Sequence, residues 1–225
     1  MIEVQEVSHR YGDRTVLRDV SVTLTEQRVG VIGANGSGKS TFARLLNGLV
    51  LPTTGSVTVD GLSTRGRSGA EVRRSVGFVF TDPDAQILMP TVAEDVAFGL
   101  RDLPRAVVSE RVAEALSSFG LAGHADHPAH LLSGGQKQLL ALCSVLVTEP
   151  KVLVCDEPTT LLDLRNTRRV LALLAELPQR VVLVTHDLDA VLAMDRVLVF
   201  DDGRLVFDGL PAEAVAFYVD LSSSE

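Results

Sequence analysis

The stretch VGVIGANGSGKST, residues 29–41, limits the possible folds of this chain more than any other segment. An apolar run leads into a loop with three glycines, and an amphipathic pattern follows the loop. Residues 33–40 fit the pattern G-x-x-x-x-G-K-[ST], whose glycines let the backbone turn its amides towards a phosphate group. The positive end of the following helix adds to this attraction. The segment therefore predicts a strand, a phosphate-binding loop and a helix, in that order.

The side chains of this loop indicate a nucleotide with a bound metal ion. Lys39 can reach the β- and γ-phosphates, and Ser40 can offer its hydroxyl to Mg²⁺. An incidental glycine- and serine-rich loop is the alternative, but it does not explain why strand, Lys-Ser pair and helix are aligned. The residues expected around the phosphates are Gly33, Asn35, Gly36, Ser37, Gly38, Lys39, Ser40 and Thr41.

Short apolar runs alternate with helical patterns along the chain. We expect strands at residues 57–60, 76–80, 151–156, 180–186 and 196–203, and helices at 39–49, 109–119, 135–148 and 165–176. Several runs are apolar on both faces, which is typical of a largely parallel sheet covered on both sides. The strand-like N-terminal third indicates an additional antiparallel layer. The pattern predicts an α/β fold.

Residues from about 82 to 131 contain helical patterns and no convincing strand, which indicates an inserted helical lobe. We therefore expect a single domain over residues 1–225. Its core lobe would comprise residues 1–81 and 150–225, and its helical lobe residues 82–149. The final LSSSE is interpreted as a frayed tail.

Composition and charge exclude several classes of protein. The chain is 46% hydrophobic and 22% charged, as globular proteins are, and its net charge of -8 argues against a dedicated nucleic-acid binder with a basic face. The N-terminus lacks the apolar segment of a signal peptide, and no apolar run approaches the roughly 18 residues of a membrane span. We expect any work at a membrane to be done through partners. Cys143 and Cys155 lie in apolar surroundings and are expected to be inert buried thiols.

The strand KVLVCD ends in two carboxylates, Asp156 and Glu157. Asp156 is placed to hold the Mg²⁺ shell through water, and Glu157 can accept a proton from water attacking the γ-phosphate. General-base assistance of this kind contributes about 10²–10⁴-fold to a rate. Adjacent acids at a strand end are more often merely solvated, so the pair has functional meaning only together with the phosphate loop.

The next apolar strand ends in Thr-His. A lone histidine after a strand is usually structural. Here the strand is expected to run parallel to the acidic one, and the carboxyl ends of parallel strands open onto one edge of a sheet. His186 is therefore expected near the γ-phosphate, as a donor to it.

The stretch LLSGGQKQ, residues 131–138, is a second candidate anion-binding segment. A serine and two glycines precede a helical pattern, so a hydroxyl and bare amides gather at a positive helix end. The residues concerned are Ser133, Gly134, Gly135 and Gln136.

The motifs GANGSGKS, LSGGQ, CDEP, LLD and TH occur in an order similar to that of the ATP-binding subunits of ABC transporters. The resemblance covers nearly the whole chain. It implies the ABC ATPase fold, a P-loop NTPase core with an antiparallel β layer and an inserted helical lobe. It also implies that two copies pair head to tail, so that the LSGGQ segment of one closes over ATP on the phosphate loop of the other.

The resemblance assigns further residues. Asp163 matches an aspartate that crosses the same dimer interface, and Tyr11 matches an aromatic residue that stacks on adenine. A helix N-cap is the alternative for Asp163, and the two roles are compatible. A strand-edge tyrosine is the alternative for Tyr11.

Residues 76–100 resemble the ATPases of energy-coupling-factor importers for vitamins and for cobalt or nickel ions. The resemblance implies that a short helix beginning near Gln86 faces a transmembrane coupling subunit, and that the short C-terminus is of the biotin-importer kind. One position departs from the family, because Thr81 stands where most members have a glutamine that contacts Mg²⁺. Either Thr81 reaches the metal through a water or Gln86 replaces the missing glutamine.

Taken together, the resemblance implies an ATP- and Mg²⁺-dependent ATPase that powers import of a vitamin, with biotin favoured, or of a transition-metal ion. It would be a homodimer at the cytoplasmic face of the membrane, bound to a coupling subunit and a substrate-binding membrane subunit. Lys39, Glu157 and His186 would be catalytic, and Ser40, Asp156 and Thr81 would hold the metal. Alternatives are an ATPase of DNA repair or chromosome maintenance, one of the translation type, and a non-hydrolysing scaffold.

Overall fold

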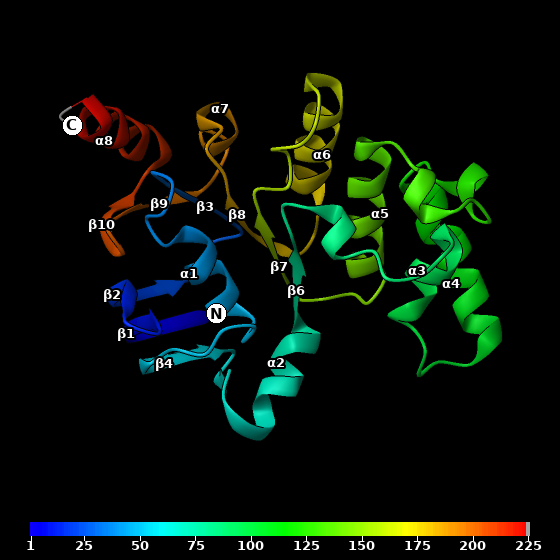
Figure 1. The fold of residues 1–225 in the computed structure, drawn as a ribbon, viewed down its shortest axis with the longest axis horizontal. Helices are drawn as coiled ribbons and strands as arrows, with labels where there is room; N and C mark the ends of the chain where they lie inside the picture. Colours follow the sequence, from blue (N-terminus) through cyan, green and yellow to red (C-terminus); the bar gives the residue numbers. More distant parts are fainter. Residues whose placement is uncertain (224–225) are drawn as a thin grey trace. The chain divides into compact units, whose positions relative to one another are not determined.

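The computed structural model of the chain (Figure 1) describes residues 1–223. The strands are β1 (Ile2–Tyr11), β2 (Arg14–Leu24), β3 (Arg28–Gly33), β4 (Thr54–Val59), β5 (Leu62–Ser63), β6 (Val76–Val79), β7 (Val152–Asp156), β8 (Arg180–Val184), β9 (Arg196–Asp201) and β10 (Arg204–Gly209). The α-helices are α1 (Lys39–Leu46), α2 (Gly69–Ser75), α3 (Val92–Phe98), α4 (Arg105–Ser118), α5 (Gly134–Leu146), α6 (Leu164–Glu176), α7 (Leu188–Val191) and α8 (Pro211–Ser223).

The chain forms two compact units. Unit 1 comprises Met1–Phe78, Lys151–Glu157 and the chain from Leu177 onward, and unit 2 comprises Val79–Pro150 and Pro158–Glu176. From the sequence, the helical lobe was expected to begin at residue 82 and end at residue 149. Unit 2 also contains α6, which was expected in the core lobe.

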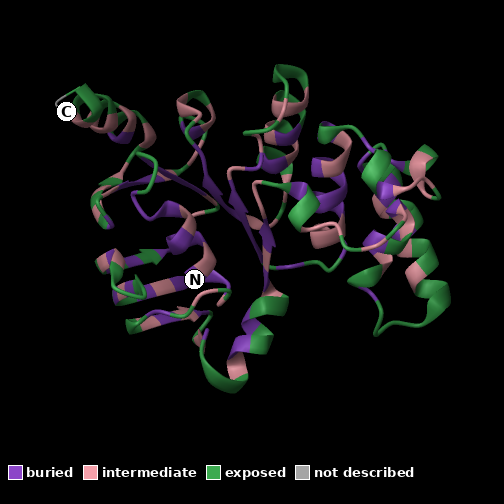
Figure 2. Cartoon of the chain, viewed as in Figure 1, coloured by how far each residue is buried: buried purple, intermediate pink, exposed green. Residues whose placement is uncertain are grey.

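A six-stranded sheet in the order β10-β9-β3-β8-β7-β6 carries the candidate site of unit 1. β3 pairs in parallel with β8 and β9, β7 pairs in parallel with β8, and β10 is antiparallel to β9. Every residue of β7 is buried, as expected for a strand covered on both faces. In Figure 2 most of the length of these inner strands is coloured as buried. The parallel pairing brings the carboxyl ends of β3, β7 and β8 to one edge.

A second sheet, β2-β1-β4-β5, confirms the expected antiparallel layer. Ile2 lies opposite Leu24 of β2 and opposite Val59 of β4, and all three side chains are buried. Helix α1 contacts β2 and β4 of this sheet and also β3, β7 and β8 of the larger one. It therefore packs between the two sheets of unit 1, where Phe42 is fully buried and packs against Phe200.

The other face of the large sheet is covered by α7 and α8 (Figure 1). Ile32, Val191 and Val199 form an aliphatic cluster there, and Phe207 stacks on Phe217 of α8 with ring centroids 5.1 Å apart. The expected frayed tail LSSSE falls partly on α8, which continues to Ser223. Residues 224 and 225 of the LSSSE segment lie outside the described part of the chain.

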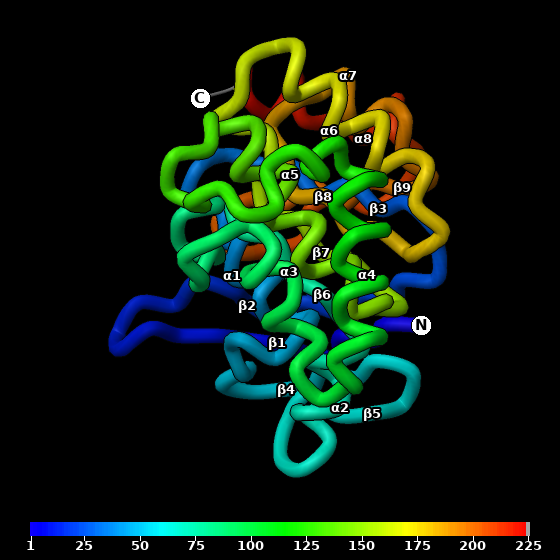
Figure 3. The backbone as a smooth tube through the Cα atoms, turned by 90° about the vertical axis from the view of Figure 1, so that its right-hand side faces the viewer, coloured from blue at the N-terminus to red at the C-terminus, as the bar shows by residue number. Residues whose placement is uncertain are grey.

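Unit 2 is mainly helical, as expected. Helix α3 packs against α4 and α5, and all three are visible in Figure 3. The prediction of a short helix beginning near Gln86 is wrong. The helical turn lies earlier, at Pro83–Ala85. The backbone N–H groups of Leu88 and Met89 donate hydrogen bonds to the Asp95 carboxylate instead of to helical carbonyl groups. Pro90 also disfavours the helical conformation at the residue before it.

Within residues 1–223, no helix combines the length and apolar character needed to cross a membrane. The two cysteines are free and fully buried. Burial raises the pKa of the Cys143 thiol to about 12 and that of Cys155 further, so the expectation of inert thiols is confirmed.

Candidate functional site

The phosphate loop connects β3 to α1, and its geometry depends on glycine. Gly38 caps α1 with a φ of 102°, a conformation that side chains disfavour. A Cβ atom there would lie 2.7 Å from Leu17 Cδ2 and 2.9 Å from the Val16 carbonyl oxygen. The close approach of β2 therefore leaves no room for a side chain at this position.

Lys39 begins α1 and turns back over the loop. Its Nζ atom donates hydrogen bonds to the carbonyl oxygens of Gly33, at 2.7 Å, and Ala34, at 2.8 Å. Burial lowers the pKa of this amine, although the carboxylates of Glu157 and Asp156 act in the opposite direction. The ammonium group is thus held inside the loop.

Ser40 and Asp156 lie side by side. The Ser40 hydroxyl donates to Asp156 Oδ1 at 2.8 Å, and Arg44 Nη2 is 3.5 Å from Asp156 Oδ2. Burial raises the pKa of Asp156, which is 1% exposed, and the contacts to Ser40 and Arg44 offset this only in part. A hydroxyl and a buried carboxylate are hard oxygen ligands, so the pair fits a Mg²⁺ ion that takes its other ligands from phosphates and water.

Glu157 and His186 meet at the carboxyl edge of β7 and β8. The backbone N–H of Glu157 donates to the Val184 carbonyl, and Glu157 Oε2 lies 3.4 Å from His186 Nδ1. Glu157 has a φ of 51°, in the left-handed region that non-glycine residues rarely adopt. The parallel register thus brings the acidic strand end and the histidine together, as expected from the sequence.

A cavity of about 280 Å³ opens beside these groups in unit 1. Its lining residues are Tyr11, Arg14, Val16, Asn35, Gly36, Gly38, Lys39, Ser40, Thr41 and Glu157. Tyr11 is 49% exposed, and its ring meets that of His9 edge-on. Arg14 and Val16 were not expected from the sequence, because only the β1–β2 hairpin brings them to the loop.

The LSGGQ segment belongs to unit 2, where it begins α5. Ser133 is the N-cap: its hydroxyl accepts from the Gln136 N–H, and the Gln136 side chain accepts from the Ser133 N–H at 2.9 Å. Such a reciprocal capping box satisfies two amides at a helix start. Gln136 Nε2 also lies 3.0 Å from His124 Nε2, a contact that no local pattern indicated.

Gly135 connects this segment to Asp163. A Cβ atom on Gly135 would lie 2.4 Å from Asn166 Cγ, so the Asn166 side chain occupies the space that a larger residue would need. Asn166 in turn donates from its backbone N–H to Asp163 Oδ1 and from Nδ2 to Asp163 Oδ2. Asp163 therefore caps α6, as one of the two alternatives expected, and sits in the same cluster as the signature glycine.

Thr81 and Gln86, the alternatives for the missing glutamine, both lie in unit 2. Thr81 is half-buried. The Gln86 side chain is engaged, because its Oε1 accepts from the Phe80 N–H at 3.1 Å and its Nε2 donates to the Ala141 carbonyl at 3.3 Å. A role for Gln86 at the metal would require both hydrogen bonds to break.

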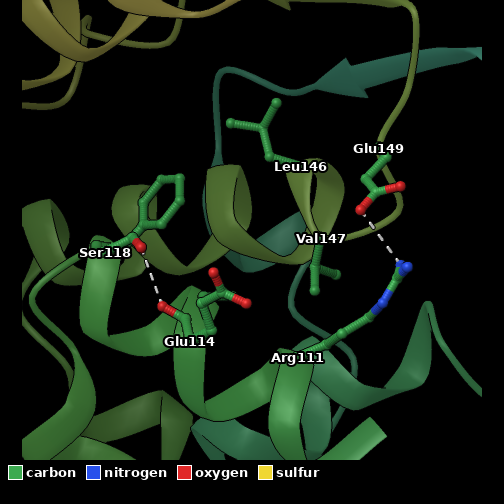
Figure 4. A pocket seen from close by; sticks show the side chains of 8 residues that line it. Arg111, Glu114, Ser118, Leu146, Val147 and Glu149 are labelled. Atoms are coloured by element: carbon green, nitrogen blue, oxygen red, sulfur yellow. Dashed lines mark hydrogen bonds and ion pairs between the residues drawn. The ribbon is translucent and has the colours of Figure 1, made fainter. Parts of the chain in front are cut away.

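Unit 2 contains another cavity, of about 250 Å³, between α4 and the end of α5 (Figure 4). Arg111 reaches Glu149 across it with a nitrogen–oxygen distance of 3.4 Å, and the Ser118 hydroxyl donates to the Glu114 carbonyl. None of the residues expected to contact a nucleotide lines this cavity.

The sequence model of the family described as ABC transporter matches residues 17–160, which is more than half of the chain. The chain belongs to the ABC transporter family. The match covers the phosphate loop, the LSGGQ segment and the acidic strand end, although not His186.

Individual relatives agree with this assignment. The biotin transport ATP-binding protein BioM of Rhizobium etli is 46% identical over 224 residues, covering 99% of each chain. The structure of cbiO1 from Clostridium perfringens, part of the ABC transporter complex cbiONQ, is 35% identical, with a TM-score of 0.84, and covers 98% of this chain and 93% of cbiO1. A dimeric ATP-binding cassette bound to ADP and phosphate is 28% identical with a TM-score of 0.83, covering 94% and 99% of the two chains. The predicted ABC ATPase fold is thereby confirmed.

Proposed function

We propose that this chain binds and hydrolyses ATP with Mg²⁺ to power an importer. The observation that carries the proposal is the convergence of Lys39, Ser40 and Glu157 on one cavity. Asp156 is attached to this group through Ser40, and His186 through Glu157. A cation, a hydroxyl and two acids beside backbone amides are what a nucleoside triphosphate requires.

In this proposal the loop amides and Lys39 hold the β- and γ-phosphates, and Tyr11 stacks on the base. Ser40 and Asp156 would hold Mg²⁺, which would neutralise phosphate charge. Thr81 is proposed as a further ligand that would act through a water. Water attacks the γ-phosphorus, Glu157 accepts its proton, and the bond to ADP breaks. His186 donates to the γ-phosphate from its other ring nitrogen, while Glu157 fixes the ring.

The signature residues act, in this proposal, on the nucleotide of a second copy. Ser133 and the amides of Gly134 and Gly135 lie at the positive start of α5, with Gln136 fixing the cap and Asp163 beside it. These groups belong to unit 2, whereas the phosphate loop belongs to unit 1. The relative that was solved as a dimer supports a pairing of two copies.

The importer type is inferred from residues 76–100 and from relatives. The segment resembles energy-coupling-factor ATPases, and the biotin transport relative covers the chain end to end. We favour biotin as the transported solute, with cobalt or nickel ions as the alternative. A transmembrane coupling subunit would bind near Leu88, which is 67% exposed, and a substrate-binding membrane subunit would complete the complex at the cytoplasmic face. No observation favours DNA repair.

Mixing two defective copies tests the composite site. A Lys39→Ala copy and a Ser133→Ala copy are each expected to be inactive as homodimers. A mixed dimer contains one site built from the intact phosphate loop of one chain and the intact Ser133 of the other, so ATP turnover should return. A mixture that stays inactive, while both variants are folded and unmodified protein turns over, contradicts the proposal.

Purification of the native complex tests the transport assignment. Membrane subunits should co-purify with the chain, and reconstituted complex should accumulate radiolabelled biotin in vesicles only with ATP. Uptake of cobalt or nickel ions instead would favour the alternative.

A further inference from the structure

One carboxylate in unit 2 joins three parts of the chain. Asp95 of α3 is only 5% exposed. Its Oδ1 accepts from the backbone N–H groups of Leu88, at 2.8 Å, and Met89, at 3.1 Å, while its Oδ2 accepts from the Ser144 hydroxyl at 2.8 Å. A buried carboxylate is costly unless it is well hydrogen-bonded, and here both oxygens are used. Asp95 thus holds the loop of Leu88 and Met89 to helix α5.

Two other contacts fasten the preceding residues to the same helix. Lys137 Nζ lies 2.7 Å from Asp84 Oδ1 and 3.0 Å from Oδ2, and Gln86 Nε2 donates to the Ala141 carbonyl at 3.3 Å. Residues three and four apart lie on one face of a helix. The partners of segment 84–89 on α5 are Lys137, Ala141 and Ser144, which follow this spacing from the first turn of α5 to its last.

Both ends of this arrangement have a place in the proposed function, on which the inference rests. Leu88 is exposed within the segment expected to meet a membrane subunit, and Ser133 caps α5 at the signature motif. We propose that the contacts of Asp84, Gln86 and Asp95 with α5, which we name the α5 latch, make segment 84–89 and the signature helix one rigid body. Asp95 and Ser144 are then positioning residues for Ser133. A displacement at Leu88 moves Ser133 with it.

Distances between spin labels test the latch directly in the isolated protein. Leu88 and Leu131 are both exposed, at 67% and 63%, and can be replaced by labelled cysteines. The native Cys143 and Cys155 are buried thiols with raised pKa values and should resist labelling. Without other substitutions, the latch predicts a single narrow distance distribution.

Ser144→Ala is the decisive variant because it detaches Asp95 from α5 and leaves the bonds to Leu88 and Met89 in place. The 88–131 distribution should broaden, while the amides of Leu88 and Met89 should stay protected from hydrogen exchange. Asp95→Ala should both broaden the 88–131 distribution and remove the protection of the Leu88 and Met89 amides. Asp95→Asn is the matched control. Its amide can accept from the backbone N–H groups of Leu88 and Met89 and donate to the Ser144 hydroxyl, so the distance distribution should stay narrow.

The Asp84–Lys137 pair gives an independent check. Lys137→Asp alone should broaden the distribution, and combining it with Asp84→Lys should narrow it again. In ATPase assays, Ser144→Ala should leave nucleotide binding by the phosphate loop unchanged and lower turnover about 2- to 30-fold, the size of effect seen when one element of a coupled network is weakened.

Unchanged distances in both Ser144→Ala and Asp95→Ala overturn the latch, as does full turnover in a Ser144→Ala protein whose distances have broadened. These outcomes are separate from failure of the proposed function, which would appear as absence of ATP turnover in the unmodified protein. The distance measurements do not depend on that activity.

Discussion

Glu157 Oε2 lies 3.4 Å from Nδ1 of His186, so the residue after β7 and the exposed histidine after β8 form one pair. The parallel register of the two strands creates this contact, with Asp156 opposite Val184. A base that is fixed by a neighbouring ring is better placed to take a proton from water than a freely rotating carboxylate.

Glu157→Gln should remove the base and keep the shape of the site. Turnover should fall about 10²–10⁴-fold, while ATP binding persists. Because ATP joins the two copies in the proposed dimer, the variant should accumulate as an ATP-bound dimer in analytical ultracentrifugation. Glu149→Gln, at another glutamate with a positive φ, is the control and should behave as unmodified protein. A Glu157→Gln protein that stays monomeric with ATP would count against the mechanism.

His186→Ala should lower turnover about 10²–10³-fold, the loss typical when one preorganised donor to transition-state charge is removed. The affinity for ATP should change little, since Lys39 and the loop amides remain. Single-turnover kinetics separate the two effects. His130→Ala, at an exposed histidine of unit 2, serves as the control. Equal turnover in the two variants would exclude His186 from the reaction.

Thr81→Gln should raise the basal ATPase rate of the isolated protein severalfold. The side chain becomes longer and carries an amide that could orient Mg²⁺ and the attacking water directly, whereas in the proposed site threonine would act only through a bridging water. Thr81→Ser keeps a hydroxyl and should leave the rate unchanged. If the glutamine variant is no faster than unmodified protein, metal positioning by Thr81 is not what limits hydrolysis.

Asp156→Asn should raise thermal stability in the absence of nucleotide. Burial raises the pKa of Asp156, so the folded state holds this proton more tightly than the unfolded state does. Stability therefore falls as the pH rises from the ordinary carboxyl pKa through the folded one, and stays reduced at neutral pH. The gain in Tm should shrink in acid, where both states are protonated, and ATPase activity should be lost. Asp202→Asn, at an exposed side chain, should not show this pattern.

Gly135→Ala should destabilise the protein by about 1–3 kcal/mol, the usual cost of overpacking, because the new methyl group would overlap Asn166. Urea unfolding measures this loss. Adding Asn166→Ala should recover stability by vacating the space. Equal stability of Gly135→Ala and unmodified protein would show that Asn166 can move aside freely.

The sequence alone determined the phosphate loop and the strands of the large sheet except β10, which was not predicted. Their signals are local: continuous apolar runs, and glycines in fixed spacing before Lys39. It also placed Glu157 and His186 at one edge, because parallel strands align their carboxyl ends. The C-terminal helix α8 was missed although Pro211 at its first position and Glu213 in its first turn are known start signals.

The tertiary structure alone decided the contacts between residues far apart in the chain. These contacts leave no periodic pattern in the sequence. Examples are the packing of Asn166 on Gly135, the contact between His124 and Gln136, and the hydrogen bonds of Asp95 to Leu88 and Ser144. Each depends on how helices pack and on which buried polar group lacks another partner. Local patterns fix which element forms, whereas the satisfaction of buried hydrogen bonds fixes how the elements are joined.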